Sequence, residues 1–392
     1  MKTIFAFCPI FYPHMGGAER TVYELYSRLV RDHGYTVFLV TINTEDAAKT
    51  EVLDGVHVYR VGRQMHNKYV KFFLLQWWVL MAYLKGRRSF SFDMIQVHYA
   101  FPASLAMFVL ARLTGKPLVI SEYHFGTGAD IYSMDQNPSY VNRVCGWIYR
   151  RAAMILTISQ DNKRFIHHVS GRDDVTVLKQ GTDHTFFSPT YRDEKVRERL
   201  LGAADVLLVT TSRISPRKNL EEMITAVSLL KKRGYRAVLV INGKVDKGNA
   251  EYDSRLREQV EKLGLQDVVI FQGFVSDQDL RVIYASSDVF LLTSKYEGFG
   301  IANVEALGSG IPVVTYDTGA AGDFITQWEN GYVVPENTPE SLAESLSQIL
   351  SDPERLHAMK KHARACVEKE LNWARYASEH GELFQTLLNA SV

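Results

Sequence analysis

The chain alternates between short apolar segments and longer amphipathic ones along most of its length. The short segments are rich in Val, Ile and Leu without polar alternation, which is typical of strands buried on both faces, and the amphipathic segments predict helices. Repeated strand–helix alternation predicts right-handed crossovers and a doubly wound parallel sheet. In the first half we expect strands at 4–8, 37–42, 56–61, 94–99, 118–123, 154–159 and 175–180, and helices at 19–31, 69–84, 104–113, 140–151 and 160–169.

The alternation breaks once, in a polar, proline-containing segment at 181–201, and then restarts. Two successive sets of strand–helix units joined by a linker predict an α/β protein of two Rossmann-like domains that face a central cleft. One domain is expected at 1–185, with a C-terminal helix at about 373–392 packing back on it, and the other at 186–372. In the second half we expect strands at 206–212, 237–243, 268–274, 289–294, 312–317 and 332–335, helices at 220–232 and 252–263, and only helices from residue 338 onward.

Composition excludes several classes of protein. With 46% hydrophobic and 23% charged residues the 392-residue chain is globular rather than disordered, and a net charge of +1 argues against a nucleic-acid partner. Three widely spaced cysteines cannot form a disulfide framework or a CxxC zinc site, so a reducing cytosol is expected. No apolar run is long enough to span a bilayer, and the N-terminus is interpreted as a buried strand rather than a signal peptide.

Ligands of open α/β sheets bind at the carboxyl ends of strands, so the loops that follow strands hold the candidate residues. The first such loop contains Gly16 and Gly17 before a helix, which favours an anion site, although a tight turn would explain the same glycines. The loop at 212–219 suits a diphosphate, with solvated helix-flanking charges as the structural alternative. Its three cations are Arg213, Arg217 and Lys218.

The segment at 296–306 combines two carboxylates with a glycine-rich helix start. Gly298 and Gly300 would let backbone amides reach a phosphate, and Glu297 beside them could also serve only to complement a helix dipole. Glu305 falls on an apolar helix face, where a carboxylate needs a partner that sugar hydroxyls would supply.

Two histidines, His98 and His124, stand at the ends of neighbouring expected strands. A lone histidine in such a place is more often structural than catalytic, but the pair favours a functional site.

These features, in this order, resemble glycosyltransferase family 4, the retaining nucleotide-sugar transferases of GT-B fold. The resemblance covers nearly the whole chain. Its most specific part is the combination of an Arg-x4-Lys motif with a Glu-x7-Glu motif. The matching segments are GGAER at 16–20, LKQGTDHTFFSP at 178–189, SRISPRKN at 212–219, GFV at 273–275 and the spacing from Glu297 to Glu305.

The resemblance implies a role for each matching residue. The first domain would bind the acceptor and the second the donor, whose diphosphate would be held by cations, backbone amides and Gly17. Glu297 would bind donor-sugar hydroxyls, Glu305 the ribose, and 273–275 the base. The implied catalytic residues are Arg213, Lys218, Glu297 and His124, and the implied donor-binding residues are Gly16, Gly17, Gly273, Phe274, Val275, Gly298, Phe299, Gly300, Ile301 and Glu305.

The implied reaction moves a hexose-type sugar from a UDP- or GDP-sugar to a glycan or lipid-linked acceptor, with retention and without a protein nucleophile, in cell-envelope polysaccharide or glycolipid synthesis. The alternatives are a GT-B epimerase or hydrolase and a non-catalytic sugar-nucleotide binding protein. No metal or other cofactor is expected. Asp277 and Asp279 formally match a metal-binding DxD pattern, but their place after Ser276 predicts a helix cap instead.

Charge is distributed unequally along the chain. Residues 1–185 hold 21 Lys and Arg against 15 Asp and Glu, whereas 186–392 hold 24 against 29. Residues 55–92 contain no acid and surround the apolar run at 72–84, which suits either an interfacial helix on anionic lipid or a core-packing helix. A second basic stretch follows at 143–151. The expected location is the cytoplasm, and the interfacial interpretation adds peripheral contact with the inner face of the membrane.

Overall fold

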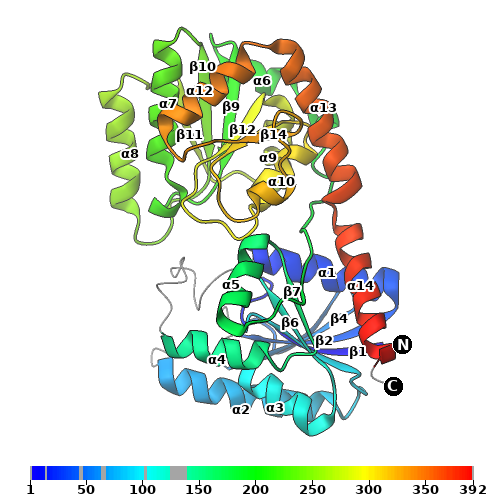
Figure 1. The fold of residues 1–392 in the computed structure, drawn as a ribbon. Helices are drawn as coiled ribbons and strands as arrows, with labels where there is room; N and C mark the ends of the chain where they lie inside the picture. Colours follow the sequence, from blue (N-terminus) through cyan, green and yellow to red (C-terminus); the bar gives the residue numbers. More distant parts are fainter. Residues whose placement is uncertain are drawn as a thin grey trace. The chain divides into compact units, whose positions relative to one another are not determined.

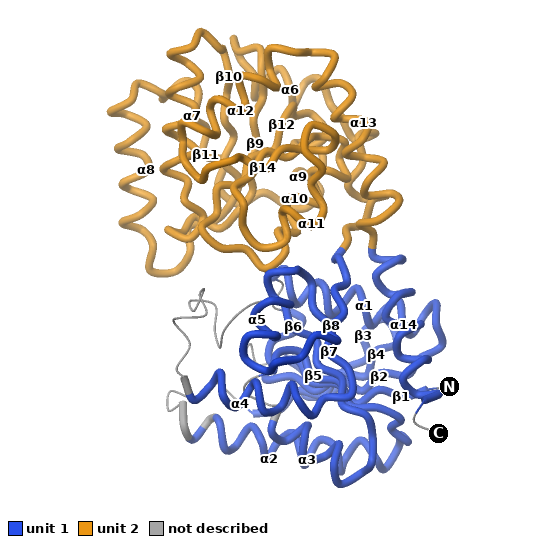
Figure 2. Tube along the Cα trace, viewed as in Figure 1, with its two compact units in different colours: residues 1–180, 373–392 blue, residues 181–372 orange. Residues whose placement is uncertain are grey.

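The computed structural model describes residues 2–13, 16–43, 47–62, 68–100, 104–123 and 139–390. The chain divides into two compact units, unit 1 with residues 1–180 and 373–392 and unit 2 with residues 181–372 (Figures 1 and 2). Each unit has its own sheet with helices on both faces. The prediction of two doubly wound α/β domains is therefore confirmed.

Unit 1 contains a sheet of order β3-β4-β2-β1-β5-β6-β7-β8. All neighbouring strands are parallel except β3 and β4, and the long runs of buried residues match the apolar runs of the sequence. The strands are β1 (Lys2–Phe7), β2 (Tyr35–Ile42), β3 (Thr50–Leu53), β4 (Val56–Val61), β5 (Met94–His98), β6 (Leu118–Glu122), β7 (Met154–Thr157) and β8 (Val175–Val177).

Strand β3 was not expected from the apolar pattern. Its residues alternate between exposed and half-buried, so the segment lacks a continuous apolar run. It pairs antiparallel with β4 through a two-residue turn in which Asp54 and Gly55 both have positive φ, at 46° and 83°. An Asp-Gly turn of this kind is a hairpin signal that the sequence does contain.

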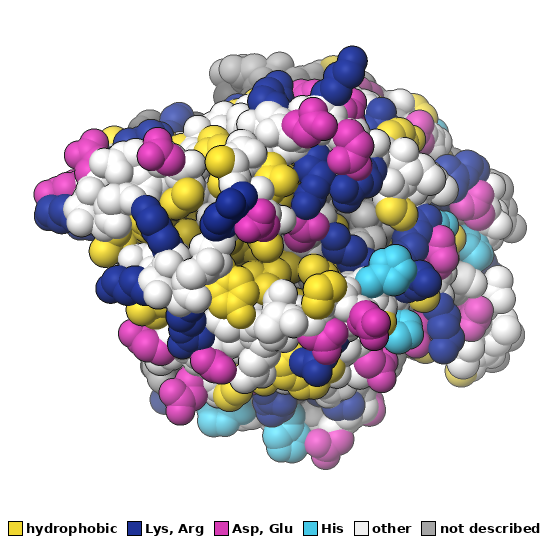
Figure 3. Space-filling view, turned by 90° about the horizontal axis from the view of Figure 1, so that it is seen from above, with side chains coloured by type: hydrophobic (Ala, Val, Ile, Leu, Met, Phe, Trp, Pro, Cys, Tyr) yellow, Lys and Arg dark blue, Asp and Glu magenta, His cyan; other side chains and the backbone are white. Residues whose placement is uncertain are grey.

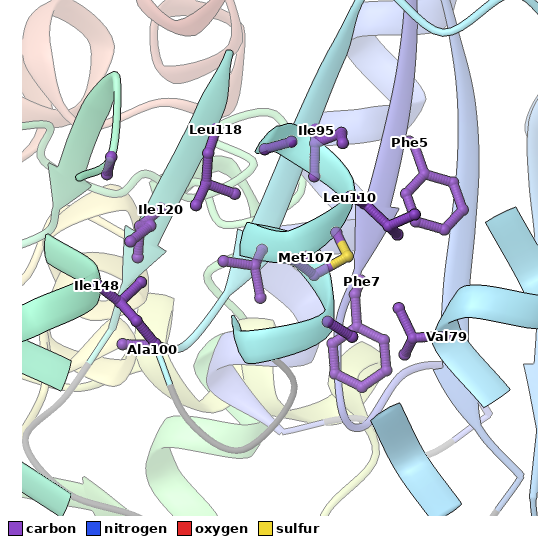
Figure 4. Close-up of a cluster of buried hydrophobic side chains, with 14 of the residues drawn as sticks. Phe5, Phe7, Val79, Ile95, Ala100, Met107, Leu110, Leu118, Ile120 and Ile148 are labelled. Atoms are coloured by element: carbon purple, nitrogen blue, oxygen red, sulfur yellow. The ribbon is translucent and has the colours of Figure 1, made fainter. Parts of the chain in front are cut away.

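Helices cover both faces of the unit 1 sheet. Figure 4 shows one face, where Phe7, Ile95 and Ile120 of the strands meet Val79 and Met107 of two covering helices. The opposite face is covered by α1 with α14 packed on it (Figure 1). The helices are α1 (Gly17–His33), α2 (Lys68–Gly86), α3 (Ser104–Thr114), α4 (Ser139–Tyr149), α5 (Gln160–Ser170) and α14 (Trp373–Ala390).

The C-terminal helix α14 belongs to unit 1. Tyr35 on β2 donates a hydrogen bond to the carbonyl of Gly381 at 3.1 Å, and its ring meets the ring of Phe384 edge-on. The two segments that connect the units lie side by side, because Thr182 N–H donates to the carbonyl of Leu371 at 2.9 Å. Gly181 is needed there, since a Cβ would stand 2.3 Å from the backbone of Asn372.

Unit 2 contains a wholly parallel sheet of order β11-β10-β9-β12-β13-β14. Its strands are β9 (Val206–Thr211), β10 (Ala237–Asn242), β11 (Val269–Gly273), β12 (Val289–Leu292), β13 (Val313–Thr315) and β14 (Gly331–Val333). Its helices are α6 (Glu194–Leu201), α7 (Leu220–Lys232), α8 (Ala250–Lys262), α9 (Asp277–Ser286), α10 (Ile301–Gly308), α11 (Ala321–Phe324), α12 (Pro339–Leu350) and α13 (Pro353–Glu370).

The segment at 181–201, interpreted from sequence as a polar linker, contains helix α6 in its second half. Asp193 accepts hydrogen bonds from the backbone of Lys195 and Val196 and so caps α6. A short helix with only Leu200 buried gives no apolar periodicity, which is why the pattern missed it, although the capping aspartate is a start signal.

The order of the strands fixes where a ligand can bind in each sheet. In unit 2 the chain runs outward from β9 to β11 and then returns to place β12 on the other side of β9. In unit 1 the corresponding switch lies between β1 and β5. Crevices at the carboxyl ends of strands at such switch points are the usual ligand sites of open α/β sheets.

Candidate active site

The candidate site of unit 2 lies at its switch point, where the loops after β9 and β12 meet. Lys295 N–H donates to the carbonyl of Arg217 at 2.9 Å, and the hydroxyl of Thr293 lies within 3.2 Å of the carbonyls of Lys218 and Asn219. These bonds hold the two loops in one fixed register. The arrangement brings together two of the sequence motifs that are separated by almost eighty residues.

At the centre of these loops, Lys218 forms an ion pair with Glu297. Arg217 places its Nη1 atom 3.7 Å from the second carboxylate oxygen of Glu297 and donates to the carbonyl of Tyr296 at 3.0 Å. The side chains of Lys218 and Glu297 are each only 11% exposed. Two cations therefore share one carboxylate in a largely desolvated place.

The environment shifts the titration of both partners. Burial lowers the pKa of Lys218 below its usual value, and the neighbouring carboxylate of Glu297 offsets part of that effect. Burial by itself would raise the pKa of Glu297, but the ammonium of Lys218 and the guanidinium of Arg217 outweigh it and lower the pKa below its usual value. Glu297 is thus an ionised acceptor at neutral pH.

A glycine of the loop after β13 packs directly against this cluster. Gly319 has a φ of +61°, and a Cβ on it would stand 2.3 Å from the carbonyl oxygen of Glu297. Only glycine allows this close approach in this backbone conformation. The position of the Glu297 backbone therefore depends on a third loop that carries no charged group of the cluster.

Arg213 pairs with Asp246, whereas Lys218 and Arg217 pair with Glu297. The guanidinium of Arg213 is 58% exposed and pairs with Asp246 in the loop after β10, at 3.3 Å. The two loops are tied together where Ile214 N–H donates to the carbonyl of Lys244 at 2.7 Å. Gly243 leaves room for this contact, since a Cβ there would stand 1.7 Å from the carbonyl oxygen of Ser212.

Residues 273–275 begin at the last residue of β11, at the same edge of the sheet. Gly273 accepts a hydrogen bond from Gly243 N–H at 2.7 Å, which ties this loop to the one after β10. Phe274 is 67% exposed, and the ammonium of Lys244 stands 4.2 Å from the centre of its ring. Val275 follows directly, so an exposed ring and a cation border this loop.

The glycine-rich segment after β12 leads into helix α10. Gly300 has a φ of +84° and is the N-cap of the helix, so that Ile301 begins it. Phe299 is buried against Phe324 at a ring distance of 5.1 Å, and Gly298 precedes it. Asn303 N–H donates to the carbonyl of Gly300 at 2.9 Å, so the amides of Ile301 and Ala302 precede the first hydrogen bond of the helix. Glu305 lies further along α10 and is buried.

In unit 1, Gly16 and Gly17 stand at the start of α1, after β1. Gly16 is the N-cap of the helix in an extended conformation and has no side chain to occupy the helix start. They therefore lie at the switch point of this sheet, where ligand loops of open α/β sheets usually stand. His124 lies outside the described residues.

His98 has a structural environment. It is completely buried, with Nε2 2.6 Å from the hydroxyl of Tyr26 and Nδ1 2.8 Å from that of Tyr123. Burial lowers its pKa to about 3, so the ring is neutral and serves as a hydrogen-bonding link between α1 and β6.

Sequence reasoning missed Glu122, the last residue of β6. Its carboxylate accepts hydrogen bonds from Ala100 N–H at 3.0 Å and from the hydroxyl of Tyr149 at 2.8 Å. Burial raises its pKa to about 7. The sequence did contain a signal for it, because Glu122 is an acidic residue at the end of an apolar strand.

The DxD pattern forms a helix cap, as predicted. Ser276 accepts a hydrogen bond from Asp279 N–H at 3.2 Å, and α9 begins at Asp277. Among the described residues, no three His, Cys, Asp or Glu side chains gather as they would around a metal ion.

Family models match both halves of the chain. A model described as Glycosyltransferase Family 4 matches residues 15–186, and one described as Glycosyl transferases group 1 matches residues 192–365. The chain belongs to glycosyltransferase family 4. The motifs of this glycosyltransferase fall in both matched regions, with the glycine loop of α1 in the first and the Lys218–Glu297 cluster in the second.

Similar proteins agree with this assignment. An uncharacterized glycosyltransferase of Methanocaldococcus jannaschii is 27% identical over 93% of each chain. A GDP-mannose-dependent alpha-(1-6)-phosphatidylinositol dimannoside mannosyltransferase of Mycobacterium tuberculosis is 31% identical over 53% of this chain and 51% of its own. The crystal structure of HepE from Anabaena in complex with UDP and glucose has a TM-score of 0.78 and 21% identity, over 98% of this chain and 100% of that one. The glycosyltransferase thus has the GT-B fold.

Proposed function

We propose that this glycosyltransferase transfers a hexose-type sugar from a UDP- or GDP-sugar to a hydroxyl of a glycan or lipid-linked acceptor, with retention of configuration. The observation that carries the proposal is the buried cluster of Lys218, Arg217 and Glu297 at the switch point of the unit 2 sheet. Relatives whose names or titles include GDP-mannose and UDP support the donor class.

The charge of the cluster suits an anionic diphosphate. Two cations and one carboxylate leave one excess positive charge in a place where little water screens it. The N-terminus of α10, which follows β12, adds partial positive charge from its first amides. Lys218 and Arg213 would bind the diphosphate and stabilise the negative charge that grows on it as the sugar leaves.

The remaining donor contacts are assigned by position. The loop at 273–275, with Phe274 exposed, would receive the base, and Glu305 the ribose. Glu297 would both orient Lys218 and accept hydrogen bonds from hydroxyls of the sugar. Gly17 and His124 would act from unit 1, which we propose to bind the acceptor. On this view the departing phosphate assists the acceptor hydroxyl on one face of the sugar, so that neither a protein nucleophile nor a metal is required.

The test combines a donor screen with a matched pair of variants. The enzyme is incubated with UDP- and GDP-sugars and candidate glycan or lipid-linked acceptors, and products are identified by mass spectrometry. Lys218→Ala should lower kcat about 10²- to 10³-fold, the loss typical of a removed electrostatic stabiliser. Lys232→Ala, at the far end of α7, removes the same charge from a solvent-exposed position and should leave the rate unchanged.

The stereochemistry is read from the anomeric proton of the product by nuclear magnetic resonance. Equal activity of the Lys218→Ala and Lys232→Ala variants would refute the role given to the cluster. An inverted anomer would refute retention while leaving the donor assignment intact. Conversion of the donor without an acceptor product would favour the epimerase or hydrolase alternative.

A further inference from the structure

Helix α2 is apolar on two opposite faces. One face packs into the core of unit 1, where Leu75, Val79 and Tyr83 are buried. The opposite face is a second apolar stripe with the three- and four-residue spacing of a single helix side. Its members are Phe73, Trp77, Met81 and Leu84, which are 71%, 57%, 37% and 46% exposed. Core packing explains the first face and leaves the second unexplained.

The stripe belongs to a layer of three helices on one face of the unit 1 sheet. Helix α3 packs beside α2, with Ala106 N–H donating to Gln76 at 2.9 Å, and beside α4, where the rings of Phe108 and Trp147 meet at 4.7 Å. These neighbours also carry exposed apolar side chains. Leu113 on α3 is 78% exposed and Tyr140 on α4 is 61% exposed.

The charges of this layer have one sign. Helices α2, α3 and α4 contain no Asp or Glu, whereas the face shown in Figure 3 mixes cationic and acidic side chains. Exposed cations on these helices or directly after α2 are Lys85, Arg87, Arg88, Arg112 and Arg143. The guanidinium of Arg151 lies 4.3 Å from the centre of the Trp147 ring, so a cation packs against an amphipathic aromatic side chain of α4.

We propose that the α2–α3–α4 layer docks on the surface of an anionic lipid bilayer, with α2 in the plane of the interface. Large apolar side chains on a helix face, in helices whose only charged residues are Lys and Arg, are the composition of interfacial helices. A protein partner would need a matching acidic surface of its own, whereas anionic headgroups supply that charge over an extended plane. No helix among the described residues is long and apolar enough to cross a membrane, which fits docking on the surface.

This inference is independent of the donor chemistry and is tested without it. The full-length protein is floated with vesicles of phosphatidylcholine alone and with added phosphatidylglycerol, at low and high salt. The Phe73→Gln/Trp77→Gln variant should lower binding roughly a hundredfold, because each lost apolar side chain costs about tenfold in partition. The Arg87→Gln/Arg88→Gln variant should lower binding about fivefold per residue at low salt.

A matched control is Val52→Gln, which removes a 59% exposed apolar side chain from β3 on another part of unit 1. It should float like the unmodified protein. Equal flotation of the Phe73→Gln/Trp77→Gln variant, equal binding to neutral vesicles, or no binding to any vesicle would overturn the proposal. Concentration-dependent self-association abolished by Phe73→Gln/Trp77→Gln, without vesicle binding, would instead assign the layer to a second copy of the chain. Circular dichroism of each variant shows that the surface substitutions leave the fold intact.

Discussion

Replacement of Gly319 by alanine should impair the candidate site without removing any of its functional groups. The added Cβ would stand 2.3 Å from the carbonyl oxygen of Glu297, well inside the 3.0 Å that real Cβ contacts keep. Because both atoms belong to the backbone or are fixed to it, no side chain can rotate to relieve the overlap. The Glu297 loop and the Gly319 loop must therefore move apart by at least about 0.7 Å.

Two separate costs follow from this change. Alanine at a φ of +61° costs about 1–2 kcal/mol, because the left-handed region is unfavourable for residues with a Cβ. Displacement of Glu297 also disturbs its ion pair with Lys218. A misplacement of about 1 Å costs on the order of 10²-fold in rate for groups that must be prearranged. We expect kcat/KM to fall between about 10- and 100-fold.

Gly264→Ala is the matched control. Gly264 has a φ of +63°, and a Cβ there would have no neighbour within 4 Å. The control therefore carries the same conformational cost without the steric overlap. Both variants are compared by thermal unfolding and by transfer from the donor that the screen identifies, with nucleoside diphosphate binding measured by calorimetry.

The expected result is a loss of stability in both variants, larger in Gly319→Ala because of the overlap, and a loss of activity in Gly319→Ala alone. If Gly319→Ala keeps kcat/KM within about threefold of Gly264→Ala, the position of Glu297 does not matter for the reaction in the way that we infer. If both variants lose activity equally, the loss reflects stability rather than the geometry of the cluster.

Three further predictions concern stability and metal dependence. Because burial raises the pKa of Glu122 to about 7, folding binds a proton between pH 4.5 and 7 and stability falls as the pH rises through this window. In the unmodified protein this fall in the free energy of unfolding amounts to roughly 3 kcal/mol in total, and Glu122→Gln should lack it when unfolding is measured from pH 5 to 8. Parallel plots of unfolding free energy against pH for the two proteins would contradict the role of Glu122. Asp288→Asn should destabilise unit 2 by about 3 kcal/mol in urea unfolding, since the buried Asp288 pairs with Arg197 and Lys360 at 2.9 Å each; an unchanged midpoint would contradict this. Transfer activity should survive dialysis against EDTA, and a loss that Mn²⁺ or Mg²⁺ restores would show metal dependence.

Much of the architecture follows from periodicity because parallel strands are buried on both faces. The apolar runs that become β1, β5 and β9 need no tertiary information to be recognised. The edge strand β3 and the exposed helix α6 bury few residues, so their positions depend on turn and cap residues rather than on hydrophobic pattern.

The candidate site was predictable as a set of motifs but not as a geometry. The spacing of the residues does not reveal that Glu297 pairs with Lys218, whereas Arg213 pairs with Asp246. That division depends on the strand order, which brings the loops after β9 and β12 together. The contact of Gly319 with Glu297 joins two loops through backbone atoms alone, so no pattern of side chains in the sequence predicts it.

The adjacent connections at Gly181–Thr182 and Leu371–Asn372 make unit 2 an insertion in the chain of unit 1. Since both ends of the inserted segment meet at one hydrogen-bonded point, residues 181–372 form a module whose removal would leave a short gap between Gln180 and Trp373. Proteins accept or exchange whole domains most readily where the two ends lie this close together. The corresponding unit of another enzyme could thus be exchanged at these two junctions while β1 to β8 and α14 keep their own chain order.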